Sequence, residues 1–184
     1  VEVAPGVRWL TMPMGGGSLN HINLYLLEDT DGWWVFDTGL PLAETTEYWQ
    51  QIFSGALNGR PVIGVICSHM HPDHIGQSGM ITEQFRCPLY MTRTEYYQAR
   101  TFSAGGPSHY GSWQSEEYFR RAGMPADYME MLSRAWQDRG ASNPAASMSQ
   151  TGVPGSYVRL QDGEVLSIGG REWRVIVGQG HSPE

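Results

Sequence analysis

Four side chains that can bind metals lie in one short stretch, and this cluster constrains the possible fold and function of the chain more than any other feature. His69, His71, Asp73 and His74 fall within six consecutive positions. On an extended backbone His69 and His71 point to the same side, and Pro72 favours an extended conformation for the residue before it. A turn after Pro72 can then bring Asp73 and His74 back toward the same point. Imidazole and carboxylate ligands suit zinc, iron or manganese, so the stretch predicts a metal site.

The sequence around the cluster places it at the end of a strand. Residues 62–67 are a short, β-branched run, which predicts a buried strand that ends directly before the cluster. Open α/β folds place their sites at the carboxyl ends of strands. Two alternatives remain at this point: Asp73 could cap the following helix, or the loop could simply be rich in histidine. The density of ligand-type side chains favours the metal site.

The remaining pattern predicts a mixed α/β fold. Strands are expected at residues 23–28 and 33–37, joined by a turn at Asp31-Gly32, and at residues 89–92. Helices are expected at residues 43–57 and 75–84. Strands return near the end of the chain, with turns at Asp162-Gly163 and Gly169-Gly170, over residues 157–160, 164–168 and 171–177. Helices and strands that alternate in this way indicate an α/β layer structure.

Residues 93–156 read as a mainly helical insertion. One apolar stripe at helical spacing is formed by Tyr128, Met131, Leu132, Ala135 and Trp136. A shorter aromatic helix is expected over residues 113–121, and residues 141–156 form a long loop rich in Ser, Gly and Pro.

We expect the insertion to form a cap over the metal site. Its apolar side chains are then candidate substrate contacts, namely Trp113, Tyr118, Met131 and Trp136. The alternative is a helical pair that packs on the flank of the sheet or joins two copies in a homodimer. Deleting residues 101–152 would separate the two, because only a cap predicts a changed substrate preference.

Composition excludes several classes of function. The chain has 184 residues, which suits one core, and its net charge is −7 with no Lys at all, which argues against a nucleic-acid partner. No apolar run reaches the roughly 18 residues of a membrane span, so no membrane partner is expected. Two cysteines cannot form a disulfide framework, which fits a reducing, cytoplasmic compartment. The chain begins at Val1 rather than Met, so a removed leader stays an open alternative.

His181 is the second element of the expected site. It follows the β run at residues 175–177 and is preceded by Gly178 and Gly180, which let the backbone approach another group closely. A single loop histidine usually has no special role. Beside a cluster that lacks a closing ligand, however, His181 is expected to complete it. The nitrogens of His69, His71 and His181 should therefore converge to within roughly 4 Å.

Together these motifs resemble the metallo-β-lactamase superfamily. The histidine pattern and the later Gly-His-Ser-Pro around His181 carry the resemblance, and the strings Phe36-Asp37-Thr38-Gly39 and Asn23-Leu-Tyr-Leu-Leu resemble the superfamily's opening strands. The chain is most similar to the glyoxalase II-like hydrolase branch. The resemblance covers residues 1–92 and 157–184. It implies a single, incomplete domain over residues 1–184, roughly the N-terminal half of an αββα sandwich with the helical insertion inside it.

The resemblance also implies a role for each residue. His69, His71 and His181 would bind a first metal, and Asp73 and His74 a second. A bridging Asp and a final His would lie beyond Glu184. Asp37 would lie beneath the metals and orient the ligands, which fits the way carboxylates fix metal-bound histidines, although an Asp before Thr38-Gly39 can also simply form a turn. Two Zn²⁺ ions are expected in the complete protein, with iron or manganese as alternatives.

The implied activity is a metal-dependent hydrolase with a small-molecule substrate. A metal-activated hydroxide would attack an ester, thioester, lactone or amide carbonyl, with Asp73 as the catalytic residue that steers the proton of the water. The alternatives are a phosphodiesterase or nuclease, a mononuclear iron oxygenase, or an inactive fragment. His21 precedes a strand and is a further candidate substrate contact, although His21 and His109 are each more simply surface histidines.

Overall fold

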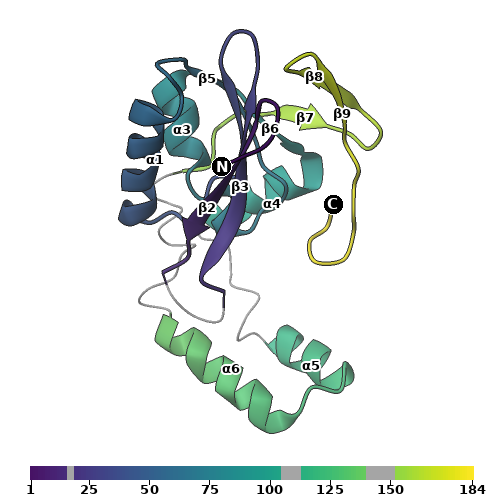
Figure 1. Ribbon diagram of the computed structural model, residues 1–184. Helices are drawn as coiled ribbons and strands as arrows, with labels where there is room; N and C mark the ends of the chain where they lie inside the picture. The colour runs from purple at the N-terminus through teal and green to yellow at the C-terminus, as the bar shows by residue number, and fades with distance from the viewer. Residues whose placement is uncertain (16–18, 105–112, 140–151) are drawn as a thin grey trace.

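The structure is a computed structural model, and it describes residues 1–15, 19–104, 113–139 and 152–184. Within these residues the chain forms a seven-stranded sheet in sequential order from β1 to β7, and a separate two-stranded sheet, β8–β9 (Figure 1). The first four strands pair antiparallel, whereas β4 to β7 pair parallel. The α/β fold class expected from the sequence is therefore confirmed.

The strands follow the predicted pattern with small shifts of their ends. The expected hairpin is β3 (His21–Glu28) and β4 (Trp33–Phe36), and the strand before the histidine cluster is β5 (Val62–Ile66). The later strands are β6 (Leu89–Thr92), β7 (Val158–Leu160), β8 (Val165–Ile168) and β9 (Arg171–Arg174). Two N-terminal strands were not predicted, β1 (Glu2–Ala4) and β2 (Val7–Pro13). β2 carries no clear two-residue alternation, so the usual signal of a strand is missing there.

Helices cover one face of the sheet. These are α1 (Ala43–Gly55), α2 (Pro72–Ile75), α3 (Ser78–Phe85) and α4 (Arg93–Ser103). The single helix expected over residues 75–84 is thus two, with Gly76 and Gln77 between them. Gln77 is fully buried, and its side-chain amide donates hydrogen bonds to the carbonyls of Leu40 and Leu42. These hydrogen bonds to a distant segment interrupt the helix at Gln77. The spacing of apolar residues in the sequence does not reveal such an interruption.

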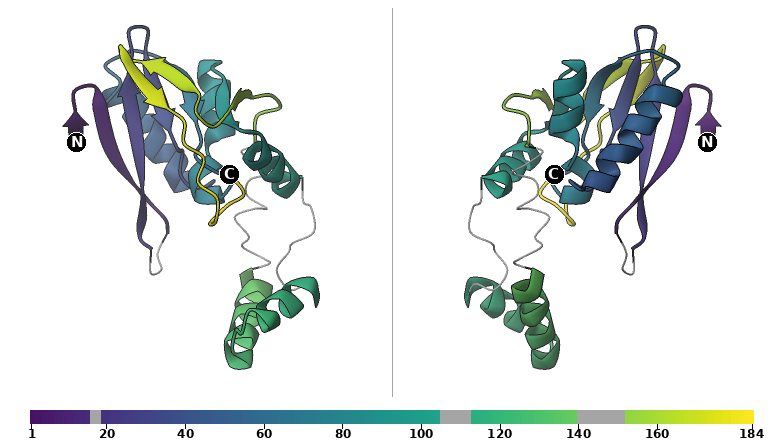
Figure 2. Two further views of the ribbon diagram at one scale, coloured as in Figure 1. Left: turned by 90° about the vertical axis from the view of Figure 1, so that its right-hand side faces the viewer. Right: turned by 90° about the vertical axis from the view of Figure 1, so that its left-hand side faces the viewer.

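Side chains on the two faces of the sheet pack into two separate hydrophobic cores. On the helical face, Leu24, Trp33 and Val35 pack with Trp49 of α1 and Ile81 of α3. On the opposite face, a smaller cluster is covered by the β8–β9 hairpin (Figure 2). Its buried members are Val7, Leu27, Ile66, Leu160 and Ile168. Between this face and the segment after β9 lies a cavity of about 670 Å³, which opens beside Ser68, His69 and His181.

The expected insertion is mainly helical in the residues that the structure describes, with a non-helical connection at residues 122–125 and a non-helical stretch at residues 152–156. It contains α4, α5 (Trp113–Arg121) and α6 (Ala126–Arg139). α4 packs on the sheet, because its Tyr96 and Ala99 belong to the main core. α5 and α6 lie together, apart from the sheet, on the side toward which the C-terminal segment loops (Figures 1 and 2). A cap over the site stays a prediction for these two helices.

None of the helices that the structure describes is long and apolar enough to cross a bilayer.

Candidate metal centre

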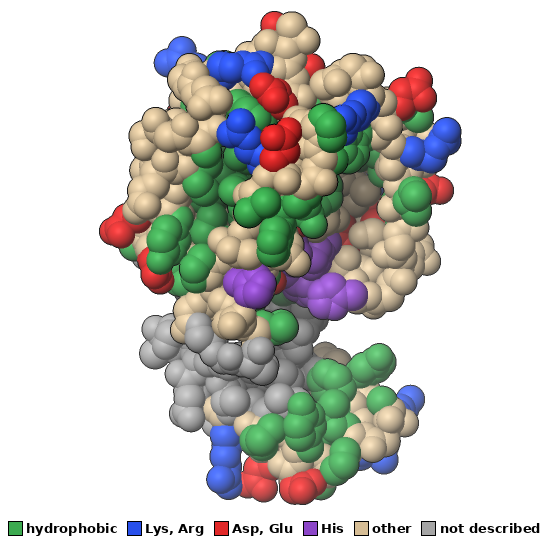
Figure 3. All heavy atoms as spheres, viewed as in Figure 1, with side chains coloured by type: hydrophobic (Ala, Val, Ile, Leu, Met, Phe, Trp, Pro, Cys, Tyr) green, Lys and Arg blue, Asp and Glu red, His purple; other side chains and the backbone are tan. Residues whose placement is uncertain are grey.

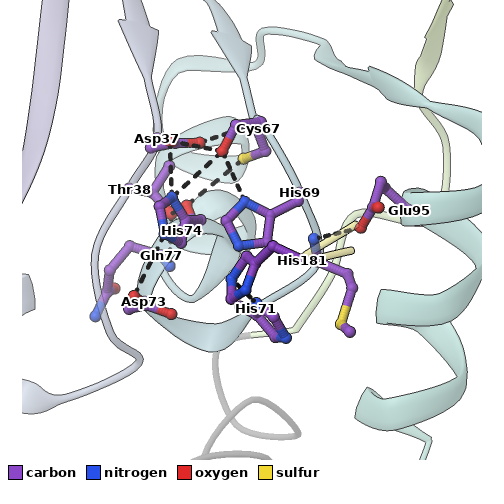
Figure 4. Close-up of polar contacts among 12 residues, drawn as sticks. Asp37, Thr38, Cys67, His69, His71, Asp73, His74, Gln77, Glu95 and His181 are labelled. Carbon is purple, nitrogen blue, oxygen red and sulfur yellow. Dashed lines mark hydrogen bonds and ion pairs between the residues drawn. The ribbon is translucent and has the colours of Figure 1, made fainter. Parts of the chain in front are cut away.

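The site is assembled where β4 and β5 end side by side. These strands are parallel neighbours, with Phe36 opposite Ile66, so the residues that follow them meet at one edge of the sheet. Asp37 follows β4, and the stretch from Ser68 to His74 follows β5. The topology therefore brings a buried carboxylate under the histidine cluster (Figure 4).

Asp37 is the anchor of the site. The residue is 3% exposed, and its backbone adopts φ 60°, a left-handed conformation that Asp tolerates better than most residues. It accepts hydrogen bonds from the Ser68 amide at 2.7 Å and from the Ser68 hydroxyl at 2.8 Å. It also lies 2.8 Å from Nδ1 of His74. A residue that only formed a turn would not need these three buried contacts.

These contacts orient two of the imidazoles. With Nδ1–H of His74 donated to Asp37, its Nε2 is the ring nitrogen that faces Asp73. Nδ1 of His69 lies 3.0 Å from the Ser68 hydroxyl oxygen, which already donates its own proton to Asp37. His69 therefore presents Nε2 as an acceptor. This buried nitrogen has no hydrogen-bond partner among the described residues.

His69, His71 and His181 converge on one point. A ligand atom from each lies within 4.8 Å of the other two, and Nδ1 of His71 is 3.0 Å from Nε2 of His181. Two nitrogens bound to one tetrahedral zinc would be roughly 3.4 Å apart, given Zn–N bonds near 2.1 Å. One pair is slightly closer than this, at 3.0 Å, and the group as a whole lies within 4.8 Å, somewhat wider than the roughly 4 Å expected from the sequence. Figure 3 shows histidine side chains at the surface on this face, and His181 is the exposed member of the group.

Asp73 and His74 lie beside this group. An oxygen of Asp73 is 3.3 Å from Nε2 of His74. The alternative in which Asp73 caps a helix is wrong: His71 occupies the N-cap position of α2, Gln77 occupies that of α3, and neither helix has a side-chain cap. Asp73 sits inside the first turn of α2, which leaves its carboxylate free to face the site.

The ionisation of these groups follows from burial and from each other's charge. Burial, with the neighbouring His74 and His71, lowers the pKa of His69 to about 4, so this imidazole is neutral near pH 7. Burial and His181 also lower the pKa of His71. Burial opposes the charged form of His74, but hydrogen bonds to Asp37 and Asp73 outweigh it and raise its pKa to about 9. Burial likewise disfavours the Asp73 carboxylate, yet His74 lowers its pKa overall.

The other candidate residues do not join this group. His21 is exposed and lies 2.5 Å from the Asn20 side chain, ring nitrogen to oxygen. Trp113, Tyr118 and Met131 are 70%, 68% and 53% exposed on α5 and α6, and none of them lines the cavity beside the site. The side chain of Trp136 and all of His109 lie outside the described residues.

Sequence reasoning missed three residues that shape the site. Ser68 links Asp37 to His69, as described above. Thr38 donates its hydroxyl to the His74 carbonyl at 2.8 Å, which fixes the end of the ligand loop. Glu95 of α4 accepts the Met70 amide at 2.8 Å. Ser68 and Thr38 each neighbour a candidate residue in the sequence, which could have drawn attention to them, whereas Glu95 gives no such signal.

Comparison with known proteins identifies the fold family. The sequence model of the metallo-beta-lactamase superfamily matches residues 17–184. The chain belongs to this superfamily. The glyoxalase II-like branch remains a prediction.

Two solved structures of the superfamily resemble the chain over almost its whole length. A beta-lactamase domain protein from Burkholderia ambifaria is 37% identical, with a TM-score of 0.78; the match covers 100% of this chain and 50% of that one. A metallo-beta-lactamase family protein from Thermus thermophilus is 24% identical, with a TM-score of 0.67, over 98% of this chain and 54% of that one. The chain therefore spans about half the length of these two proteins.

A curated relative matches a smaller share of the chain. An uncharacterized protein from Aquifex aeolicus (strain VF5) is 24% identical over 122 residues, which are 66% of this chain and 40% of the relative.

The residues present fit a divalent metal. Three imidazoles meet at one point, and a carboxylate lies beside them. One of the imidazoles presents a buried nitrogen that has no partner in the described part of the chain. An unsatisfied buried polar atom is costly in a native structure. A cation at this point would satisfy it. Nitrogen and oxygen donors of this kind suit zinc, and also iron or manganese.

Proposed function

We propose that the chain carries the metal centre of a hydrolase that cleaves an ester, thioester, lactone or amide bond of a small molecule. The observation that carries the proposal is the convergence of His69, His71 and His181 around the unpaired nitrogen of His69. Zinc is the proposed metal, with a second ion beside Asp73 and His74. When bound, such metals supply a water of lowered pKa and polarise the carbonyl oxygen of the substrate.

The chain's own residues hold and orient this site. His69, His71 and His181 would bind one metal, and the carboxylate of Asp37 fixes the ring of His74 for the other. The lowered pKa of Asp73 keeps its carboxylate ionised at neutral pH, and this carboxylate would accept a hydrogen bond from the attacking water and steer its proton. No separate nucleophilic side chain is needed for this chemistry.

A test of metal dependence checks the proposed activity. The full chain would be stripped with a chelator and then given Zn²⁺, Mn²⁺ or Fe²⁺ in turn, with chromogenic esters, thioesters, lactones, amides and a phosphodiester as substrates. We expect hydrolysis of a carbonyl substrate to appear only after a metal is restored, because the water is otherwise not activated. Equal rates with and without metal, or cleavage of the phosphodiester alone, would contradict the proposal.

A further inference from the structure

Glu95 is a buried carboxylate outside the proposed ligand set. It lies in α4 and is 0% exposed. One of its oxygens, Oε2, accepts the backbone amide of Met70 at 2.8 Å. The other, Oε1, accepts the backbone amide of Glu184 at 2.9 Å. Figure 4 shows Glu95 reaching from α4 toward the loop of the histidine cluster. Both of its oxygens are therefore used by main-chain donors.

The two donors belong to the two segments that carry the proposed ligands. Met70 lies between His69 and His71, and Glu184 lies three residues after His181. One carboxylate thus ties together backbone segments that are far apart in the sequence. A buried carboxylate is costly unless it is hydrogen-bonded, and hydrogen bonds to a charged acceptor are the stronger kind. A packing role alone would be served better by an apolar side chain at this position.

Glu184 binds α4 in return. Its own side chain accepts the amide of Thr94, in the first turn of α4, at 3.0 Å. Thr92 occupies the N-cap position of α4, but its side chain makes no capping hydrogen bond. The Glu184 carboxylate takes this role, because it accepts the Thr94 amide, one of the helix N-terminal amides that have no partner within the helix. The bond to Thr94 lowers the pKa of Glu184. The segment after His181 is therefore fixed to α4 by a reciprocal pair of hydrogen bonds.

We propose that Glu95 is a positioning residue that sets the place of His181 relative to His69 and His71. The inference rests on the proposed metal site. Glu95 touches neither metal nor substrate and acts through the backbone of both ligand segments. The 3.0 Å approach of His71 to His181 is the distance that this link maintains.

The test is Glu95→Gln in the full chain. The amide keeps one acceptor oxygen but turns its NH₂ group toward the second backbone N–H, so one of the two links is lost. We expect the affinity for Co²⁺ or Zn²⁺ to fall about 10- to 100-fold, as for other residues that support metal ligands. The visible spectrum of bound Co²⁺ should also change. In the metal-free protein, hydrogen exchange at the Met70 and Glu184 amides should accelerate.

Tyr96→Phe is the matched control. Tyr96 follows Glu95 on α4, is buried, and donates its hydroxyl to the Pro154 carbonyl at 2.8 Å. This variant also removes a hydrogen bond of α4, but it leaves both ligand segments linked. We expect a lower melting temperature with unchanged metal affinity. Equal losses of affinity in Tyr96→Phe and Glu95→Gln would overturn the inference, as would wild-type affinity in Glu95→Gln.

Two further measurements test the role of Glu95 if the Glu95→Gln variant does not fold or if the wild-type chain binds no metal. If Glu95→Gln does not fold, Glu184→Ala removes the side-chain bonds of Glu184 to the start of α4 but keeps its backbone amide, which Glu95 accepts. We expect a several-fold loss of metal affinity, and wild-type affinity would count against the link. If the wild-type chain binds no metal, the proposed function fails. Hydrogen exchange at Met70 and Glu184 then decides whether Glu95 joins the two segments.

Discussion

Asp37→Asn will weaken metal binding about 10- to 100-fold. Asn fits the left-handed backbone at this position and has nearly the same shape as Asp. Its amide, however, presents one acceptor and one donor to a pocket that holds only donors: the amide and hydroxyl of Ser68, and Nδ1–H of His74. One of them loses its partner, or His74 moves its proton to the nitrogen that would face the metal. Either change disturbs the ligand set.

Calorimetric titration of Zn²⁺ into the metal-free protein measures this effect. The free energy of unfolding should also fall by about 1–3 kcal/mol, the usual cost of an unsatisfied buried polar group. Asp29→Asn is the matched control, because Asp29 accepts the Thr30 amide at 2.8 Å and the Trp34 indole N–H at 3.1 Å in a turn remote from the site. Metal binding by Asp37→Asn as tight as in the control would show that Asp37 does not orient the ligands.

Asp73→Ala will abolish hydrolysis while largely sparing the fold. The carboxylate caps neither α2 nor α3, and its described side-chain partner is His74 at 3.3 Å. Its loss should therefore cost at most about 1 kcal/mol of stability, the value of a charge near a helix N-terminus. Turnover should fall by at least about 100-fold, because a general base typically contributes about 10²- to 10⁴-fold and the variant also removes a proposed ligand.

Thermal melting curves and turnover rates of the same variant separate a loss of stability from a loss of activity. Glu44→Ala serves as the control, because Glu44 also lies in the first turn of a helix, α1, and accepts the Tyr48 hydroxyl at 2.9 Å. It should show a comparable small change in stability with full activity. A variant of Asp73 that keeps its turnover would refute the catalytic role.

The sequence predicted the parts of this fold that depend on local pattern. The β-branched run before the histidines marks β5, and the Asp31-Gly32 turn marks the β3–β4 hairpin. The histidine spacing itself places His69 and His71 on one side of the loop. These features need only near neighbours in the sequence, which is why the pattern is enough to find them.

The supporting residues could not be predicted because their partners are distant in the chain. The helix break at Gln77 depends on the carbonyls of Leu40 and Leu42. Glu95 lies in a polar helical sequence, and both of its backbone donors belong to other segments. A carboxylate of this kind looks like an ordinary surface residue until tertiary structure buries it.

Three histidines from two distant segments are proposed to hold one metal, and anomalous diffraction would locate that metal. Crystals of the full chain grown with Zn²⁺ would be measured on both sides of the zinc absorption edge. We expect an anomalous peak bonded to nitrogens of His69, His71 and His181 at about 2.1 Å. A zinc peak held elsewhere, or His181 turned away from a metal bound by His69 and His71, would contradict it.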